Sequence, residues 1–311
     1  MRKAKRAGAD FIKVYSRLDR ESFLAIADEA RRLRLPVCGH AADAVPIVEA
    51  ARAGQRSFEH FFPALFGVSG KESEVRRLID AIKIQGKGTG VHDWFAAIHP
   101  ADWLACTTYD PHRAADVYAQ LKESGAAMTP TLVMHRVTDL PDDVVADKER
   151  LRYLPPGTEE SWKADLAEIF TKGRTPAQAA QHREIYRHRL RILNDMHRAG
   201  VPILAGTDAP VMYLNPGFAL HDELAQLVAA GFTPMAALQA ATRDPARHLG
   251  LQDSLGTIRK GHLADLVVLN ANPLDDIRNT LRIHSVMTRG RYLSAADRDR
   301  LLASIEAAAK T

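Results

Sequence analysis

The stretch PVCGHAADAVPIVEAARAGQRSFEH, residues 36–60, contains a complete strand–helix–strand pattern. A β-like run at 36–39 ends at His40, a helical pattern near 43–53 ends at Gly54, and a second β-like run at 56–60 ends at His60. Strands that alternate with helices indicate a parallel sheet. Side chains that follow the carboxyl ends of such strands converge on one face of an α/β barrel, so we expect the two histidines to lie close together.

Two further polar side chains follow β-like runs in the same way. Lys13 comes after Phe11 and Ile12 in a strand near 10–15, and Asp208 follows the apolar run 201–204 of a strand over 201–206. Two imidazoles, a carboxylate and a lysine at the ends of parallel strands indicate metal-assisted hydrolysis.

The remaining pattern continues the alternation of strands and helices. Helices are expected near 19–33, 71–84, 112–124, 183–198, 218–230 and 234–248, with a strand in AAMTPTLVM at 126–134. Residues 85–112 indicate a long loop over the barrel mouth, and 139–182 a helical excursion. After residue 250 the pattern becomes short β runs, followed by an Ala-rich helix at about 295–309.

Composition excludes several classes of protein. The 42 basic and 38 acidic residues give a net charge of only +4, which does not favour nucleic acid as a partner. Cys38 and Cys106 are the only cysteines, so there is no disulfide framework. No run approaches the roughly 18 apolar residues of a membrane span, and the basic residues at the start precede no apolar core of a signal peptide.

Several stretches resemble the metal-dependent amidohydrolase superfamily, in particular its imidazolonepropionase-like and Xaa-Pro dipeptidase-like branch. They are GADFIKVY, GHAADAVPIVEAARAG and SFEH near the start, and GVPILAGTDAP, LHDELAQLVAAGFTPMAALQAATRDPARHLGL and GTIRKGHLADLVVLNANPLDDI in the last third. The resemblance implies a (β/α)8 TIM-type barrel over 1–250, part of a small β-sandwich over 251–295, and a terminal helix over 296–311. The family's first barrel strand ends in His-x-His, which this sequence lacks. We therefore expect an incomplete barrel without its first three strand–helix units, from a fragment, a gene-model truncation or a shortened relative.

The same resemblance implies a role for each of the four residues. Lys13, once carboxylated, bridges two metals, His40 and His60 bind the second metal, and Asp208 both contacts metal and acts as the general base. The residues alone leave other interpretations open. These are a lysine extending from a strand end, a hydrogen-bonded core histidine and an aspartate that caps a turn. The expected cofactor is a divalent metal, zinc, with two ions in an intact relative and at most one bound tightly here.

The implied reaction is cleavage of an amide or cyclic amide C–N bond by a metal-activated hydroxide, with dipeptidase-like activity favoured. The alternatives are a cyclic amidase or deaminase acting on a small heterocycle, and a non-catalytic remnant. Weaker candidates for substrate binding are Tyr109, Arg113 and His221, for which a solvated loop or an ordinary helix start are alternative interpretations. The expected partner is a small amide or dipeptide, without nucleic acid or membrane. Open sheet edges favour a homo-oligomer, and a cytoplasmic location is favoured.

Overall fold

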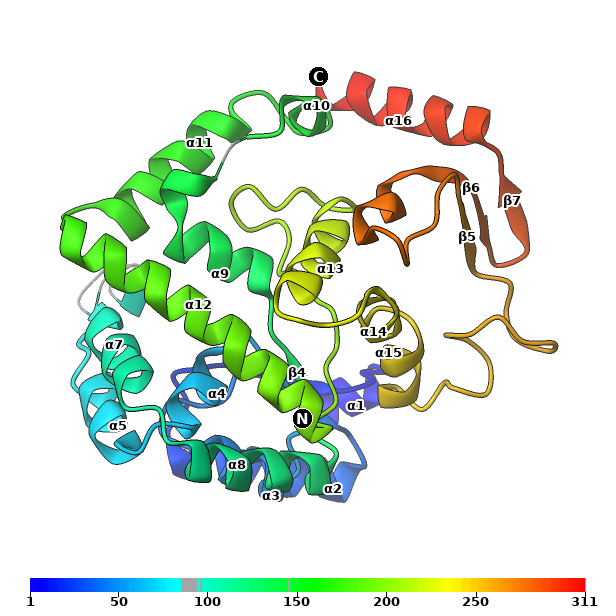
Figure 1. Cartoon of the computed structure of the whole chain (residues 1–311). Helices are drawn as coiled ribbons and strands as arrows, with labels where there is room; N and C mark the ends of the chain where they lie inside the picture. Colours follow the sequence, from blue (N-terminus) through cyan, green and yellow to red (C-terminus); the bar gives the residue numbers. More distant parts are fainter. Residues whose placement is uncertain (85–93, 96, 145, 311) are drawn as a thin grey trace. The chain divides into compact units, whose positions relative to one another are not determined.

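The computed structural model describes residues 1–84, 94, 95, 97–144 and 146–310, which form two compact units (Figure 1). The first unit comprises Met1–Thr131 and Arg174–Ile203, and the second comprises Leu132–Gly173 and Leu204–Thr311.

The first unit is built on two short parallel sheets, each of two strands that follow one another in the sequence, and a single parallel bridge links them. Strand β1 (Ile12–Val14) pairs with β2 (Val37–Gly39), and β3 (Ser57–Glu59) pairs with β4 (Ala127–Thr129). Parallel bridges from Val37 to Gln55 and from Met128 to Ile203 continue the sheet on either side of the second pair. Consecutive parallel neighbours joined through helices are the arrangement of an α/β barrel wall.

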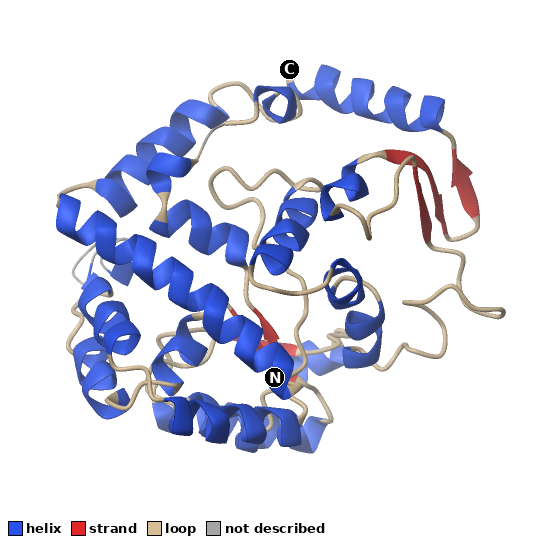
Figure 2. Cartoon of the chain, in the orientation of Figure 1, coloured by secondary structure: helices blue, strands red, loops and turns tan. Residues whose placement is uncertain are grey.

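Helices connect these strands, and Figure 2 shows how they dominate the chain. In the first unit they are α1 (Arg2–Arg6), α2 (Arg20–Leu33), α3 (Ile47–Ala53), α4 (Phe62–Gly67), α5 (Glu72–Asp80), α7 (His99–Thr107), α8 (Pro111–Ser124) and α12 (Pro176–Ala199). Local sequence explains their ends. The Asp19 carboxylate accepts a hydrogen bond from the Ser22 amide at the start of α2, and Gly125 ends α8 in the left-handed region.

The second unit combines helices with an antiparallel sheet. Its helices are α9 (Leu132–Asp139), α10 (Lys148–Leu151), α11 (Thr158–Asp165), α13 (Ala219–Ala229), α14 (Pro234–Ala240), α15 (Arg243–His248) and α16 (Ala295–Ala309). Short 3-10 helices span Pro141–Asp143 and Ile277–Leu281, and a π-helix spans Leu166–Thr171. Strands β5 (Leu266–Leu269), β6 (Ile283–Thr288) and β7 (Arg291–Leu293) form the sheet in that order.

Some sequence predictions of elements are confirmed and others are wrong. The helices expected near 19–33 and 112–124 and the terminal helix match α2, α8 and α16. The loop expected over 85–112 contains helix α7, while 85–93 lie outside the described residues. The strand expected over 126–134 ends at Thr129, because Pro130 and the left-handed Thr131 turn the chain into α9. The expected strand 201–206 is reduced to the single bridge at Ile203.

Helix boundaries also differ from the sequence pattern. The helix expected over 43–53 begins only after Pro46, and the long helix begins at Pro176 rather than 183, where Thr175 forms a capping box with Gln178. The helix expected over 234–248 is two helices, interrupted near Thr242. The domain boundaries expected at 250 and 295 stay predictions.

A buried ion pair holds three helices of the first unit together. Arg189 of α12 is fully buried, and its guanidinium donates a hydrogen bond of 3.0 Å to the Asp102 carboxylate of α7. The same guanidinium lies 4.8 Å from the centre of the Phe62 ring in α4. A buried charge of this kind is tolerated only because its partner is present.

A buried carboxylate anchors the start of α9 in the second unit. Glu223 of α13 is fully buried, and its two carboxylate oxygens accept hydrogen bonds from the amides of Leu132 (3.1 Å) and Val133 (2.9 Å). Burial raises the pKa of Glu223 to about 8, although both amide bonds act in the opposite direction. The anchored residues directly follow Thr131, a buried residue at the end of the first unit's N-terminal segment.

Within the described residues, no helix has the length and apolar character needed to cross a membrane.

Replacing Arg189 by Ala should destabilise the protein strongly, because Asp102 would remain buried without its guanidinium. We expect a loss of about 3–5 kcal/mol in the free energy of unfolding, measured by chemical denaturation. Arg187→Ala is the matched control, since Arg187 is exposed on the same helix and forms its ion pair with Glu184 at the surface. That control should change stability by less than about 0.5 kcal/mol. Equal losses in both variants would contradict the stabilising role of the buried pair.

Glu223 should make stability fall as pH rises. Its pKa is raised in the folded state, so the folded state binds more protons than the unfolded state between the ordinary value of 4.5 and about 8. The stabilisation is complete below that window and is lost as pH rises through it. Above about pH 6.5, where the buried histidines no longer oppose this trend, we expect a decline on the order of 1 kcal/mol per pH unit.

Chemical denaturation across this pH range measures the slope, and Glu223→Gln supplies the comparison because its side chain does not titrate. The Gln variant should lose the slope and be less stable at every pH, since its amide group presents N–H toward the backbone N–H groups of α9. A slope that survives the substitution would assign the pH dependence to another group.

Candidate metal centre

Two histidine rings meet at the carboxyl edge of the first unit's parallel sheet. His40 follows β2, His60 follows β3, and their Nε2 atoms are 3.1 Å apart. The ring centres are 4.6 Å apart and the planes are nearly perpendicular, at 82°. The sequence prediction that these two strand-end histidines lie together is met by this geometry.

The backbone at the strand ends places both rings. The His40 amide donates a hydrogen bond of 3.2 Å to the carbonyl of Val14 in β1, and the His60 amide donates one of 2.9 Å to the carbonyl of Thr129 in β4. His60 itself has a positive φ of 66°, which turns its side chain out of the strand direction. Each histidine is therefore fixed by the strand beside its own.

A hydroxyl group lies at the Nδ1 atom of each ring. Ser16 Oγ is 2.7 Å from His40 Nδ1, and Thr131 Oγ1 is 2.9 Å from His60 Nδ1. Tyr15 adds a third restraint, because its ring stacks on His40 with centres 4.0 Å apart. Sequence analysis missed these three residues. The signal that would have found Ser16 and Thr131 is their position as hydroxyl residues just beyond the strands that end near Lys13 and Thr129.

The surroundings keep His40 neutral. Burial, together with repulsion from the nearby cationic forms of His60 and Lys13, lowers the pKa of His40 to about 3. A neutral imidazole has one N–H and one lone pair, and the lone pair is what a metal requires. At ordinary pH this ring is therefore in the form that can bind a cation.

The pair fits a divalent metal. If each Nδ1–H donates to its hydroxyl, both Nε2 lone pairs point into the same 3.1 Å gap and repel each other. A cation placed beside that gap removes the repulsion and accepts both lone pairs, as imidazole ligands do for zinc. Within the described residues, no group of three or more His, Cys, Asp or Glu side chains gathers to hold a metal ion.

Lys13 lies next to this pair in the sheet. It is exposed on β1 and paired in register with Cys38, and its Cγ would be 3.1 Å from a Cβ added at Gly39. Its positive charge contributes to the lowered pKa of His40. Carboxylation of Lys13 stays a prediction.

Asp208 belongs to the second unit, so its part in a shared site also stays a prediction. It is exposed and has a positive φ of 62°, and its carbonyl accepts a hydrogen bond from the Val211 amide. The next long helix, α13, begins only at Ala219. The backbone at Asp208 therefore forms a turn, and its exposed side chain follows the apolar run 201–204.

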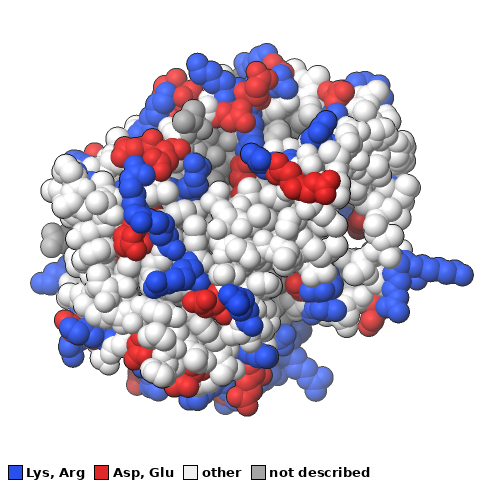
Figure 3. Space-filling view, in the orientation of Figure 1, with Lys and Arg blue, Asp and Glu red and all other residues white. Residues whose placement is uncertain are grey.

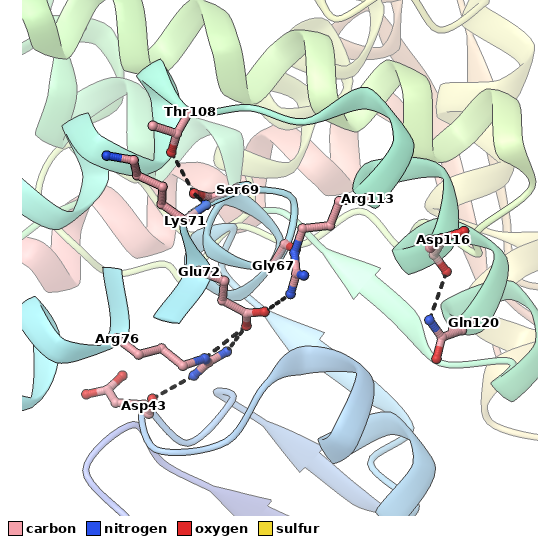
Figure 4. A network of polar contacts seen from close by, with 10 residues as sticks. All are labelled: Asp43, Gly67, Ser69, Lys71, Glu72, Arg76, Thr108, Arg113, Asp116 and Gln120. Carbon is pink, nitrogen blue, oxygen red and sulfur yellow. Dashed lines mark hydrogen bonds and ion pairs between the residues drawn. The ribbon is translucent and has the colours of Figure 1, made fainter. Parts of the chain in front are cut away.

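Arg113 takes part in a network of charged groups (Figure 4). Its guanidinium donates to the Gly67 carbonyl at 2.8 Å and forms an ion pair with Glu72. Arg76 donates to Glu72 at 2.9 Å and to the carbonyl of Asp43 at 2.8 Å. Arg113 is therefore engaged within the first unit, and its expected contact with substrate stays a prediction.

The other two weak candidates lie in different units. Tyr109 packs edge-on against His188 and under the guanidinium of Arg191, which lies 5.1 Å from the ring centre. His221 lies in the first turn of α13, as the sequence indicated, and burial lowers its pKa. Substrate binding by either residue stays a prediction.

Charges of both signs are interspersed on the face shown in Figure 3, among larger areas without charge. This mixture agrees with the small net charge and gives no extended single-sign surface on that face.

Comparison with known proteins decides the family. The model of the amidohydrolase family matches residues 18–293, most of the chain. The chain belongs to this family. Amidohydrolases of this kind hydrolyse carbon–nitrogen bonds and generally bind divalent metals.

Among curated amidohydrolases, the imidazolonepropionase of Aeromonas hydrophila subsp. hydrophila is 32% identical over 99 residues, which are 30% of this chain and 23% of that protein. The ochratoxinase of Aspergillus niger is 40% identical over 83 residues, 26% of this chain and 16% of that protein. Among solved structures, a bottromycin amidohydrolase is 27% identical with a TM-score of 0.71, over 99% of this chain and 60% of that one.

A Xaa-Pro dipeptidase with bound methionine is 20% identical with a TM-score of 0.56, over 94% of this chain and 57% of that one, and it shows the fold alone. The predicted fold class, an α/β amidohydrolase of the TIM-barrel type, is confirmed by these likenesses. The chain spans about 60% of the length of the solved amidohydrolase with the higher score.

The absence of a side chain at Gly39 should be essential for bringing the His40 ring close to the His60 ring. A Cβ at this position would lie 2.3 Å from the Val14 carbonyl oxygen, the atom that accepts the His40 amide, and φ is 120°. Gly39→Ala should lower the free energy of unfolding for two reasons: the positive φ strains the backbone, and the added Cβ clashes with strand β1. The clash should add about 2 kcal/mol or more to the loss caused by the backbone strain.

Gly54→Ala is the matched control, because Gly54 has a similar φ of 109° and no atom within 4 Å of the added Cβ. Chemical denaturation of both variants measures the difference. Similar losses for the two would show that strand β1 does not restrict position 39.

Proposed function

We propose that this amidohydrolase cleaves the C–N bond of a small amide with the help of a divalent metal. The observation that carries the proposal is the convergence of His40 and His60, whose Nε2 atoms are 3.1 Å apart and whose Nδ1 atoms both face hydroxyl groups. Two buried or half-buried imidazoles in this orientation have little use as packing residues, because their lone pairs repel unless a proton or a cation lies between them.

The residues assigned to the metal are His40, His60, Lys13 in its carboxylated form, and Asp208. Lys13 lies on β1, while His40 and His60 directly follow β2 and β3. Asp208 follows the apolar run 201–204 and belongs to the second unit. Zinc is the proposed ion because imidazole and carboxylate are its usual ligands in hydrolases. When bound, it supplies a positive charge that lowers the pKa of water to about 7 and polarises the substrate carbonyl.

Asp208 performs the proton transfers in this proposal. Its carboxylate takes a proton from the attacking water, whose oxygen adds to the amide carbon, and then gives that proton to the leaving nitrogen as the C–N bond breaks. The exposed position of Asp208 suits a group that meets both water and substrate. The products are a carboxylic acid and an amine, and transfer of the remaining acid proton to the amine gives a carboxylate and an ammonium ion.

The proposed substrate is a dipeptide. Solved amidohydrolases of similar fold include the Xaa-Pro dipeptidase with methionine bound in its active site and a prolidase complexed with N-methylphosphonate-L-proline. A second candidate is a small cyclic amide, supported by the 32% identity with imidazolonepropionase over 99 residues. Both classes present a carbonyl carbon bonded to nitrogen, so the same proton transfers serve either. A homo-oligomer in the cytoplasm remains part of the proposal.

A chain with this ligand set should bind at most one divalent metal tightly and hydrolyse dipeptides far more slowly than an intact relative. His60→Ala should abolish tight binding, because a single imidazole remains, and Asp208→Asn should lower the hydrolysis rate by about 100-fold or more while leaving His40 and His60 in place. Elemental analysis of purified protein and release of free amino acids from dipeptides measure the two effects.

His112→Ala and Asp116→Asn are the matched controls, since both residues are exposed on α8. Neither should change metal content or rate. Two tightly bound metals per chain, or a full hydrolysis rate that survives both His60→Ala and Asp208→Asn, would show that the ligand assignment is wrong.

A further inference from the structure

We infer that Gln55 is a positioning residue that sets the separation of His40 and His60, and through it the affinity of the first unit for a metal ion. The inference rests on the proposed function, because it concerns the same pair of histidines. Gln55 itself touches neither metal nor substrate in this inference. It acts through the backbone of the two strands that the histidines follow.

The two histidines follow strands that belong to different sheets. His40 follows β2, which shares three register pairs with β1, and His60 follows β3, which shares three with β4. Between β2 and β3, the described residues show a single parallel bridge, from Val37 to Gln55. That bridge lies three residues before His40 and five before His60. The ends of β2 and β3, where the rings lie, are therefore joined by something other than a continued backbone ladder.

The Gln55 side chain spans the gap beyond this bridge. Its Nε2 group donates hydrogen bonds to the carbonyls of Gly39 (3.0 Å) and His40 (3.2 Å) at the end of β2, and to the carbonyl of Ser57 (3.0 Å) in β3. Three carbonyl oxygens around one atom identify that atom as the amide nitrogen, since each of them requires a donor. One side chain thus takes the place of backbone hydrogen bonds between the two strand ends.

Gln55 is itself held in place. Only 1% of the residue is exposed, and its backbone amide donates a 3.0 Å hydrogen bond to the carbonyl of Ala50 in the last turn of α3. Helix α3 is the connection from β2 to β3. The backbone of Gln55 is therefore tied to this connection and its side chain to both strands. Because the side chain is buried and bonded at its far end, it defines one spacing of the strands.

The other half of the same amide indicates a role beyond filling space. The Oε1 atom of Gln55 is buried, and it finds no hydrogen-bond partner among the described residues. A buried acceptor without a partner lowers stability, and an apolar side chain of similar length would avoid that loss. An apolar side chain could not donate to three carbonyls, however. The observation that distinguishes Gln55 is this donation across the gap between the strands.

The spacing matters because a metal ion must reach both imidazoles at once. Nitrogen ligands lie about 2.0–2.1 Å from zinc, so the two rings tolerate little relative movement. A displacement of about 1 Å is enough to spoil a site of this kind. The His40 carbonyl is one of the three atoms that Gln55 holds, and the His40 and His60 ring centres are 4.6 Å apart. Without the amide, the end of β2 is free to move away from β3.

The first test measures metal affinity in the full 311-residue chain. Zinc dissociation constants are obtained by competition with a chromophoric chelator for the wild type, Gln55→Met and Gln55→Asn. The Met variant keeps the length of the side chain but removes the donor, and it should weaken zinc binding by about 10- to 100-fold. The Asn variant keeps an amide on a shorter side chain and should give a smaller loss. It also provides the test if the Met variant fails to fold.

A second measurement follows the two rings in metal-free protein. In the wild type, rings whose centres are 4.6 Å apart should give a nuclear Overhauser effect between the carbon-bound ring protons of His40 and His60. The effect should weaken or vanish in Gln55→Met, because the strand ends are no longer joined. This readout reports the spacing of the rings directly and depends on neither metal binding nor activity.

The matched control is Ser69→Ala, which also removes buried hydrogen bonds from the first unit. The Ser69 hydroxyl lies 2.7 Å from Thr108 Oγ1 and accepts a 3.0 Å hydrogen bond from the Lys71 amide, both at helix ends. This variant should keep the ring contact and the zinc affinity of the wild type. Thermal unfolding identifies any variant that fails to fold. An equal loss of affinity in Ser69→Ala would assign the effect to general destabilisation and overturn the inference.

The two hypotheses fail in different ways. A wild-type chain that binds zinc while both Gln55 variants bind it equally well overturns the inference and leaves the proposed function standing. A wild-type chain that takes up no metal overturns the metal part of the proposed function, and the ring contact then decides the role of Gln55 alone. A ring contact that persists unchanged in both folded variants overturns the positioning role, whatever the metal affinity.

Discussion

The parallel pairing of β1 with β2 is the constraint on which the candidate site depends. The strands are three residues long and share only three register pairs, yet they bring the Val14 carbonyl within reach of the His40 amide. That approach leaves no room for a side chain at Gly39, so the chemistry at the strand end depends on a missing Cβ one residue earlier. The positions of Lys13 and Ser16 follow from the same pairing, because they lie on β1 or just beyond it.

The first unit then adds the other half of the site through β3 and β4. The His60 ring reaches the gap because its own strand pairs in register with the strand before Thr131. The helices outside the sheet are held by apolar packing and by the buried Arg189, whose planar guanidinium contacts both a carboxylate and an aromatic face. Polar groups thus lie at two places in the unit: the buried ion pair between the helices and the histidine pair at the strand ends.

The strand–helix alternation was predictable wherever periodicity and capping residues agreed, as at α2 with Asp19 and α8 with Gly125. Prediction of elements from the sequence failed where tertiary contacts override the local preference of the chain for a strand or a helix. Leu132, Val133 and Met134 have the apolar character of a strand, but a buried carboxylate from α13 captures the first two amides and starts a helix. The histidines were predictable because each ends a β-like run. The hydroxyls beside them were not, since serine and threonine after a strand are common and only spatial pairing distinguishes these two.

The parallel pairing of Met128 in β4 with Ile203 has a consequence for folding during synthesis of the chain. The bridge partner of Met128 is Ile203, which is reached only after the whole segment that contributes α9 to α11 and the long helix α12. During synthesis at roughly 5–20 residues per second, β4 is complete for several seconds before its neighbour exists. Throughout that interval an apolar strand presents unpaired backbone groups, a condition in which chaperones bind nascent chains and neighbouring copies aggregate. The sequence separation between Met128 and Ile203 thus makes this pairing one of the late steps in the assembly of the first unit.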